Sequence, residues 1–345
     1  MTRRDLMKIG FACKFMHENQ ELRKKELDEK ERPYRVATTT LRWLNNQTKD
    51  VAEQRLWEML RQNISAFYNL VAYVATLPVE LRMVRLGSDV LPLYTEPTWS
   101  RFWQQHDVRE YCAHYFSKVG DLARQHDVRL SMHPGQFTVL ASDRDEVVQK
   151  SIEEFEYHVD VARWMGYGKL FQDFKINVHI SGRRGPQGIK DVLSRLSPEA
   201  RNCLTIENDE ISWGIHASLE LADVCALVLD LHHHWVATGE YIFPEDDRFK
   251  RMIDSWRGVR PVVHYSVSRR SLLCNQDPDQ LPDFSQLMAQ GIKKMQLRAH
   301  SDFMWNNACN DWALSFVESA DIMVESKAKN LASIQLYQRW LLRQK

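Results

Sequence analysis

Short apolar runs alternate with longer amphipathic stretches along almost the whole chain. Each run is about five to eight residues long, which is the length of a typical strand. The runs predict β-strands at 6–13, 82–87, 128–133, 175–180, 203–207, 225–230, 260–266 and 321–325. The stretches between them predict helices at 50–77, 108–126, 145–166, 187–197, 215–223 and 246–256, with a last helix that ends near residue 344.

This alternation of strand and helix indicates an α/β fold with a parallel sheet. The runs are apolar almost throughout, as expected for strands that are covered on both faces. A chain of 345 residues accommodates eight strand–helix units, so we expect a TIM (β/α)8 barrel. The chain lacks a linker rich in Pro, Gly or Ser, and residues 1–345 are therefore expected to form one domain. A long insert at 267–310, with helical pieces near 283–296 and 306–318, precedes the last strand.

Acidic or histidine side chains stand at the ends of seven successive predicted strands. They are Asp89, His133, His179, Glu207, Asp230, His264 and Glu325. In a β/α barrel the carboxyl ends of all strands converge on one mouth, so residues that are far apart in sequence meet there. One histidine on an apolar run is usually a core residue. Seven such strand ends together predict a metal centre, whose cations offset the cost of burying the carboxylates.

The mixture of imidazole and carboxylate groups favours zinc, manganese or iron over calcium or magnesium alone. Three consecutive histidines, His232, His233 and His234, follow the sixth predicted strand. One or two of them suffice as ligands, and we expect the others to lie in a loop that faces solvent.

The formal net charge is zero, with 46 basic and 46 acidic residues. Bulk charge therefore does not favour generic binding of polyanions, but a local basic cleft is compatible with it. Candidate phosphate contacts are Arg183 and Arg184, which follow the fourth predicted strand, and Lys327, which follows the eighth. For all three, a solvated surface position is the alternative interpretation.

No apolar run reaches about 18 residues, so no membrane span is expected. The N-terminus is basic but has no long apolar segment, and we do not expect a signal peptide. Six cysteines stand singly, at positions 13, 112, 203, 225, 274 and 309, which suits reduced and mostly buried thiols. The sequence thus predicts a cytoplasmic protein.

At the strand ends the sequence resembles the UV-damage endonuclease family, whose barrel has the plan of xylose isomerase and of the endonuclease that cuts at abasic sites. The motifs that carry the resemblance are 130–137 (Leu-Ser-Met-His-Pro-Gly-Gln-Phe), 177–182 (Asn-Val-His-Ile-Ser-Gly), 204–210 (Leu-Thr-Ile-Glu-Asn-Asp-Glu), 230–233 (Asp-Leu-His-His) and 323–329 (Met-Val-Glu-Ser-Lys-Ala-Lys). The stretches 10–13 and 40–42 also look like that family, and the resemblance extends from about residue 8 to 330.

The resemblance implies a DNA repair endonuclease with two or three divalent metal ions, with manganese as the first expectation and zinc or magnesium as alternatives. Such enzymes cut the strand on the 5′ side of a UV photoproduct in double-stranded DNA, and we expect a monomer. The implied ligands are His133, His179, Glu207, Asp230, His233, His264, His300 and Glu325, to which Asp89 is added. Direct catalytic roles are expected for Glu207, Asp230, His264 and Glu325.

Family members also probe the lesion with a small wedge, which implies DNA contacts for Gln136, Phe137 and Phe11. A wedge can fill the gap that remains when a poorly stacked, damaged dinucleotide is pulled from the duplex. Phe11 and Phe137 stand where tyrosine is common, so stacking is retained without a phenolic hydrogen bond. Asp89 stands where relatives often have a histidine, which still allows ligation but changes the affinity or preference for the metal.

Three other functions stay open on the residues alone. An apurinic/apyrimidinic endonuclease shares the fold and the metal chemistry but cuts at a different lesion. A metal-dependent sugar isomerase or epimerase on the same barrel also uses His and Glu at strand ends, but it needs fewer ligands and no wedge. A non-catalytic metal- or nucleic-acid-binding module is least favoured, because the ligand set is dense and the net charge is zero.

Overall fold

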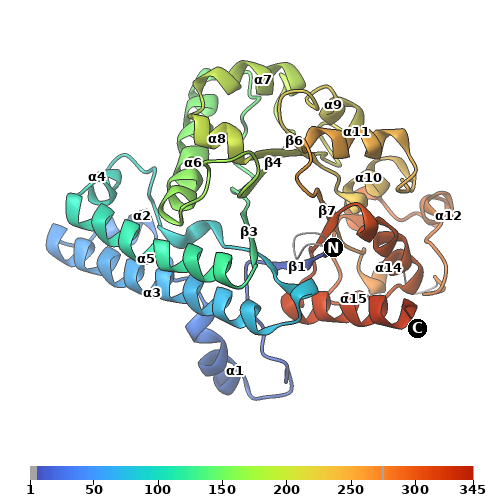
Figure 1. Cartoon of the computed structure of the whole chain (residues 1–345), viewed down its shortest axis with the longest axis horizontal. Helices are drawn as coiled ribbons and strands as arrows, with labels where there is room; N and C mark the ends of the chain where they lie inside the picture. Colours follow the sequence, from blue (N-terminus) through green and yellow to red (C-terminus); the bar gives the residue numbers. More distant parts are fainter. Residues whose placement is uncertain (1–5, 274–275, 345) are drawn as a thin grey trace.

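A ring of eight strands lies at the centre of the computed structural model, which describes residues 6–273 and 276–344 (Figure 1). The strands are β1 Ile9–Ala12, β2 Met83–Arg85, β3 Arg129–Met132, β4 Lys175–His179, β5 Leu204–Glu207, β6 Ala226–Val228, β7 Val262–Tyr265 and β8 Asp321–Val324. Each lies within one of the apolar runs that predict it. The predicted strand positions are therefore confirmed, and each run extends beyond its strand because it also supplies flanking loop residues.

All neighbouring strands run parallel, in the order β6-β5-β4-β3-β2-β1-β8-β7. The two ends of this order meet at an isolated parallel bridge between Asp230 and His264. There the backbone nitrogen of His264 donates a hydrogen bond to the carbonyl oxygen of Leu229 at 2.9 Å. The sheet thus closes almost completely into a barrel, which confirms the predicted TIM (β/α)8 fold class.

Helices surround the ring of strands, and α3 and α5 lie side by side on one flank (Figure 1). The helices are α1 Lys24–Glu31, α2 Leu41–Asn45, α3 Lys49–Thr76, α4 Ser100–Trp103, α5 His106–Gln125, α6 Asp145–Trp164, α7 Gly185–Val192, α8 Pro198–Cys203, α9 Ile215–Leu219, α10 Leu231–Thr238, α11 Asp247–Ser255, α12 Phe284–Ala289, α13 Lys294–Leu297, α14 Asn307–Leu314 and α15 Lys329–Arg343. The long helices α3, α5, α6 and α15 confirm their predictions to within a few residues.

The expected solvent-facing loop after the sixth strand is wrong, because this segment forms α10. The carboxylate of Asp230 caps the helix by accepting a hydrogen bond from the backbone nitrogen of His233 at 2.6 Å. Gly239, with φ of 79°, ends the helix in the left-handed conformation that glycine adopts at little cost. All three consecutive histidines, His232 to His234, are buried on this helix.

The amino ends of the strands are joined by a network of buried charges around Asp321. This carboxylate accepts hydrogen bonds from Arg129 Nη1 at 2.7 Å, from Arg260 Nε at 2.8 Å and from the backbone nitrogen of Lys8 at 2.8 Å. Lys8 Nζ pairs in turn with Asp127 Oδ2 at 2.9 Å. Both oxygens of Asp321 thus have partners, and the charge of this carboxylate is compensated within the protein.

The 267–310 segment leaves and re-enters the barrel at the mouth beside β7. An antiparallel bridge joins Ser268 to His300, and the nitrogen of Ser301 donates to the carbonyl of Val267 at 2.8 Å. Between these points, α12 and α13 bury Leu287 and Leu297 against Trp235 of α10. The segment therefore returns His300 to the same end of the barrel as the other candidate ligands.

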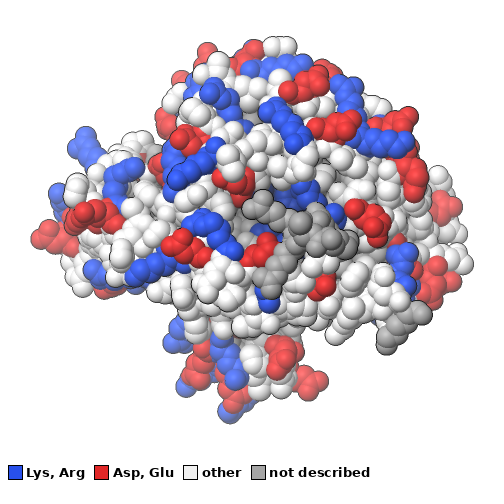
Figure 2. Space-filling view, in the orientation of Figure 1, with Lys and Arg blue, Asp and Glu red and all other residues white. Residues whose placement is uncertain are grey.

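Acidic and basic side chains are interspersed on the face seen in Figure 2, without a broad region of one sign. Within the described ranges, no helix is both long and apolar enough to cross a membrane. The five cysteines in those ranges are unpaired, and Cys112, Cys203, Cys225 and Cys309 are buried, as expected. Cys274 lies outside the described residues.

Candidate metal centre

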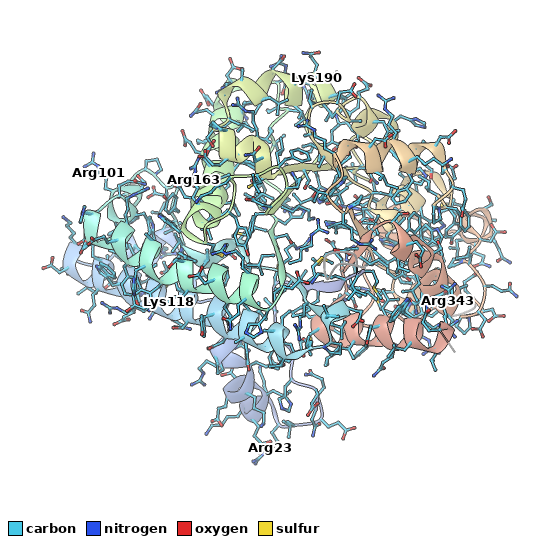
Figure 3. All side chains as sticks on the ribbon, in the orientation of Figure 1. Arg23, Arg101, Lys118, Arg163, Lys190 and Arg343 are labelled. Carbon is cyan, nitrogen blue, oxygen red and sulfur yellow. The ribbon has the colours of Figure 1, made fainter. Side chains whose placement is uncertain are left out.

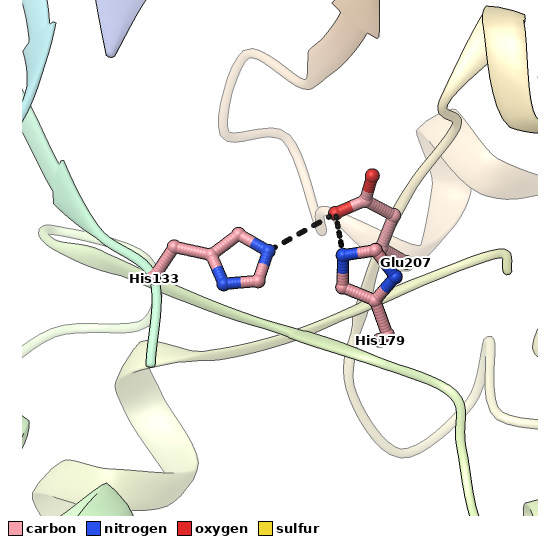
Figure 4. Close-up of side chains that lie close together, drawn as sticks. All are labelled: His133, His179 and Glu207. Carbon is pink, nitrogen blue, oxygen red and sulfur yellow. Dashed lines mark ion pairs between the residues drawn. The ribbon is translucent and has the colours of Figure 1, made fainter. Parts of the chain in front are cut away.

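Three ligand-type side chains converge from the carboxyl ends of neighbouring strands β3, β4 and β5. His133 follows β3, while His179 and Glu207 are the last residues of β4 and β5 and lie in register with each other. Figure 4 shows that both imidazoles point at one carboxylate: Oε2 of Glu207 lies 3.6 Å from His133 Nε2 and 3.8 Å from His179 Nε2. Ligands that share one ion at bond lengths of about 2.0–2.2 Å lie roughly 3–3.5 Å apart, so little movement is needed to hold a metal.

Four overlapping groups of such side chains occur among the described residues. They are His133–His179–Glu207, His179–Glu210–His233, Glu207–Asp230–His233 and Asp230–His264–Glu325. Within each group the potential ligand atoms all lie within 4.8 Å of one another. Glu207, Asp230 and two histidines each belong to two groups, so the arrangement could hold several adjacent ions that share ligands.

The inner part of the centre is almost completely buried. His264 Nδ1 lies 3.1 Å from Glu207 Oε1 and 3.2 Å from Glu325 Oε1, and the side chains of His264 and Glu207 are at most 1% exposed. His233 Nδ1 lies 3.5 Å from the same Glu207 oxygen, and its Nε2 lies 3.5 Å from Glu210 Oε2. Glu207 thus stands at the centre of the constellation, with one oxygen toward each side.

Several buried atoms of this cluster have no hydrogen-bond partner among the described residues. They are Glu207 Oε1, Glu210 Oε2, Asp230 Oδ2 and His264 Nδ1. Leaving a buried carboxylate oxygen unpaired is costly, because it loses its water without a replacement. Divalent cations would satisfy these atoms together, so the donor set fits a resident metal centre.

The crowding of acids and bases shifts the pKa values in opposite directions. Burial lowers the pKa of His233, but Asp230, Glu207 and Glu210 overcome this and raise it to about 10. The pKa of His179 is likewise lowered by burial yet raised to about 9 by Glu207 and Asp209. Burial, relieved in part by His233 and reinforced by Glu207, holds the pKa of Asp230 well above its ordinary value. The metal-free centre therefore carries protons that bound cations would replace.

A second set of polar side chains orients the ligands, and sequence reasoning missed it. Asn177 donates to Glu207 Oε2, Arg85 Nη1 donates to Glu325 Oε1 at 2.5 Å, and Asp209 Oδ2 accepts from His179 Nδ1 at 3.1 Å. Lys175 Nζ lies 2.8 Å from His264 Nε2. A signal for two of these exists: 175, 177 and 179 are alternate positions of one strand, so their side chains share a face.

Glu210 is a candidate ligand that the sequence analysis did not assign. Its side chain is 5% exposed and pairs with Arg298, which comes from the 267–310 segment. His300 lies near the centre, with its ring 5.5 Å from that of His232, but it completes none of the four groups. Asp89 is exposed and belongs to none of them either. Ligation by His300 and Asp89 stays a prediction.

Gln136 and Phe137 occupy the tip of a tight turn beside the centre. The nitrogen of Thr138 donates to the carbonyl of Gly135 at 2.9 Å, which leaves the two residues between them projecting. Phe137 is 85% exposed, the highest value among the large apolar side chains that are exposed in the described residues. The turn thus presents an unpaired aromatic ring at the mouth.

The expected DNA contact of Phe11 is wrong. Phe11 lies in β1 with 0% exposure, because both faces of a barrel strand are covered and its ring packs into the core. The candidate phosphate contacts are exposed: Arg183 pairs with Asp143 at 3.1 Å, and Arg184 pairs with Asp191. Lys327 Nζ is also exposed and lies 3.6 Å from Asp302.

Comparisons with known proteins fit this geometry. The model of the family described as UV-endonuclease UvdE matches residues 7–343. A UV DNA damage endonuclease of Bacillus cereus (strain B4264) is 24% identical over 311 residues, which cover 87% of this chain and 87% of that protein. One of Bacillus mycoides (strain KBAB4) is 25% identical over 308 residues and 84% of both proteins. The crystal structure of SacUVDE has a TM-score of 0.70 and 22% identity, covers 98% of both chains, and thus shares the fold.

Proposed function

This chain belongs to the UV-endonuclease UvdE family, and on that premise we propose that it is a metal-dependent DNA repair endonuclease that cuts the backbone on the 5′ side of UV photoproducts. The observation that carries the proposal is the set of four overlapping ligand groups at the barrel mouth. A sugar isomerase on this fold needs fewer ligands and has no use for a projecting aromatic turn, so both features favour the nuclease.

When bound, divalent ions neutralise charge on the phosphate and lower the pKa of a water, so that this water can lose a proton at neutral pH and attack the phosphate. The residues of the chain prepare this site. Glu207 and Asp230 each belong to two ligand groups, so each would help to hold two adjacent ions. Arg85 holds Glu325 in place, and Asn177 does the same for Glu207. Such supporting contacts typically govern metal affinity and activity by about 10–100-fold.

Manganese is the ion that we propose as native, in two or three copies. The carboxylate oxygens of the four groups suit manganese, and the groups contain no thiolate, a donor that would favour zinc. Zinc and magnesium are the competitors. Because each of the four groups is complete within one chain, a monomer suffices to form the centre.

The turn at Gln136 and Phe137 supplies the proposed recognition of the lesion in double-stranded DNA. An aromatic ring that is 85% exposed loses unfavourable contact with water when it stacks on a base. A photoproduct stacks and pairs poorly, so less energy is needed to open the duplex there than at intact bases. The wedge would therefore select the damage, and the metal centre would cut the strand.

The decisive experiment gives the purified protein manganese and supercoiled plasmid, with and without UV irradiation. Nicks are expected only in irradiated plasmid and should vanish with a chelator or in Glu207→Gln. Glu146→Gln, a matched change of an exposed carboxylate on α6, should cut normally. Preferential nicking of abasic plasmid would indicate that the substrate is an abasic site and not a photoproduct. Absence of nicking with manganese, zinc and magnesium would refute the nuclease.

A further inference from the structure

A hollow of about 380 Å³ lies beside the metal centre, between the segments that follow β1 and β8. Its lining comprises four basic side chains, two aromatic ones, one methionine and one carboxylate: Lys14, Arg35, Lys327, Lys329, Phe15, Tyr34, Met16 and Glu31. We call it the basic hollow. Because both segments follow the carboxyl ends of their strands, the hollow opens on the same end of the barrel as the candidate ligands.

Positive charge in the basic hollow is only partly neutralised. Arg35 pairs with Asp28 at 2.5 Å and with Glu31 at 3.6 Å, which accounts for its charge. Lys327 lies 3.6 Å from Asp302, whereas none of the ion pairs among the described residues involves Lys14 or Lys329. Two neighbouring cations without a counter-ion repel each other, and this repulsion falls when an anion binds between them.

Lys329 connects the basic hollow to the metal centre. Burial lowers the pKa of its ammonium group, and the nearby cations Arg85 and Lys14 lower it further, while Cys13 and Glu325 act in the opposite direction. Glu325 is itself one of the candidate ligands and pairs with Arg85. Electrostatic interactions thus link the metal centre to the hollow.

The backbone on both sides of the basic hollow adopts an unusual conformation. Cys13 has a φ of 69° and Lys329 a φ of 50°, and they are two of the six non-glycine residues with positive φ in the described chain. Residues are rarely held in this region unless the surrounding structure fixes them, and such residues concentrate at ligand-binding sites. The two loops therefore hold Lys14 and Lys329 toward a common space at the expense of local strain.

The walls of the basic hollow are fixed rather than adaptable. Asn330 of α15 accepts a hydrogen bond from the nitrogen of Met16 at 2.8 Å and donates one to its carbonyl oxygen at 2.9 Å. The ring of Phe15 packs on that of Tyr34 at 4.2 Å and on that of Tyr73 at 4.7 Å. A ligand would meet a formed site, with little ordering left to oppose binding.

We propose that the basic hollow binds a backbone phosphate of the DNA strand where that strand leaves the metal centre, with Lys14 and Lys329 as its contacts. The inference rests on the proposed nuclease function and adds one fixed anchoring point for the substrate. A phosphodiester is the fitting ligand, because ammonium groups contact phosphate oxygens as point charges. The aromatic wall then faces the adjoining sugar.

Binding of UV-irradiated duplex to the metal-loaded protein at several salt concentrations tests this proposal. The double variant Lys14→Gln/Lys329→Gln should bind at least about tenfold more weakly, and the slope of log affinity against log salt should fall by about one. The matched control is Lys118→Gln/Lys190→Gln, which removes the same charge from exposed lysines on α5 and α7 (Figure 3). Equal affinities and slopes for the two double variants would overturn the proposal.

Duplexes with a single neutral methylphosphonate then locate the phosphate. Wild-type protein should lose affinity at one position near the photoproduct, and Lys14→Gln/Lys329→Gln should be insensitive there, while the conservative variant Lys329→Arg should keep the wild-type sensitivity. Metal content and melting temperature, measured on every variant, identify a misfolded one. If wild type fails to nick DNA but these differences persist, the proposed nuclease fails and the basic hollow stands. If wild type nicks irradiated DNA but no methylphosphonate position distinguishes it from the double variant, only the proposed phosphate site in the basic hollow is refuted.

Discussion

At the amino ends of the strands both oxygens of Asp321 accept hydrogen bonds, whereas at the carboxyl ends Glu207 and Asp230 each keep one oxygen unpaired among the described residues. Both ends bury carboxylates to a similar degree, with exposures of at most 2%. The difference is in the partners: two arginines and a backbone N–H surround Asp321, while acids and imidazoles surround Glu207. One end thus has fixed counter-charges built in, and the other depends on protons held by His179 and His233 or on cations from outside.

This contrast separates stability from activity within a single ring of strands. A buried carboxylate whose partners are complete contributes to the fold, and removing it leaves the partner charges uncompensated. A buried carboxylate whose partners are incomplete destabilises the metal-free fold and gains its value when cations bind. Substitutions at the two ends should therefore have opposite signatures.

Glu207→Gln should produce the largest effect on activity. Removing the carboxylate that two ligand groups share should lower nicking at saturating DNA by on the order of 1,000-fold, because a bound metal supplies several kcal/mol to such reactions. Above about pH 10, where His179 and His233 are neutral, the metal-free protein should unfold at the same temperature or a higher one, since an unpaired buried charge disappears. Nicking assays and thermal melts in chelator measure the two effects, and a large loss of metal-free stability would break the contrast.

Asp321→Asn should give the opposite result. Arg129 and Arg260 would lose their carboxylate, and breaking such a buried network typically costs about 3 kcal/mol. Urea unfolding should show this loss, while the nicking rate per folded molecule should stay within about twofold of wild type. A rate that fell with the stability would indicate that the two ends are coupled.

Changes in metal concentration and pH should affect stability through the residues at the carboxyl ends of the strands and not through those at the amino ends. Below about pH 6.5 the raised pKa values of His179 and His233 contribute their full stability to the metal-free protein, and this contribution is lost as pH rises to about 10. Metal affinity should follow the opposite trend, because protons compete with the ions and are released on binding. At 100 times Kd one ion adds about 2.7 kcal/mol. Calorimetry in buffers of different ionisation enthalpy counts the released protons, and none at pH 7 would contradict the prediction.

Phe137→Ala should have the smallest effect, confined to recognition. Loss of one stacking ring should weaken binding to irradiated duplex by about 1–2 kcal/mol and leave binding to intact duplex nearly unchanged. Bound metal, quantified in the same sample, should be the same as in wild type. Phe243→Ala provides a matched control, because that exposed ring lies after α10 and outside the wedge. Equal losses on damaged and intact DNA would remove the selective role of the turn.

The sequence predicted the strands well because a strand covered on both faces is apolar throughout, and this pattern stands out from amphipathic helices. The candidate ligands at 133, 179, 207 and 264 could be predicted because strand ends of a barrel share one mouth. Helix α10 could not be identified as easily. Its start depends on a cap made by Asp230, a residue whose position also suits a metal ligand.

Side-chain direction limited the remaining site predictions. Phe11 lies one residue before the end of β1, and one residue changes which face of a strand a side chain occupies. Glu210 and Arg298 meet only through the 267–310 segment, whose path follows from its packing on α10 and not from a local motif. Contacts set by long-range packing leave little trace in the order of residues.

The seam between β6 and β7 gives the metal centre a mechanical consequence. Among the described strands, these two are joined only by the bridge at Asp230 and His264, and both residues belong to one ligand group. An ion bound there would cross-link β6 and β7, which share the fewest backbone hydrogen bonds of any neighbouring pair among the described strands. We expect amide hydrogens along this seam to exchange quickly with solvent deuterium in chelator and slowly with metal, while those of β1, which carries no candidate ligand and pairs with β2 and β8, exchange at one rate throughout.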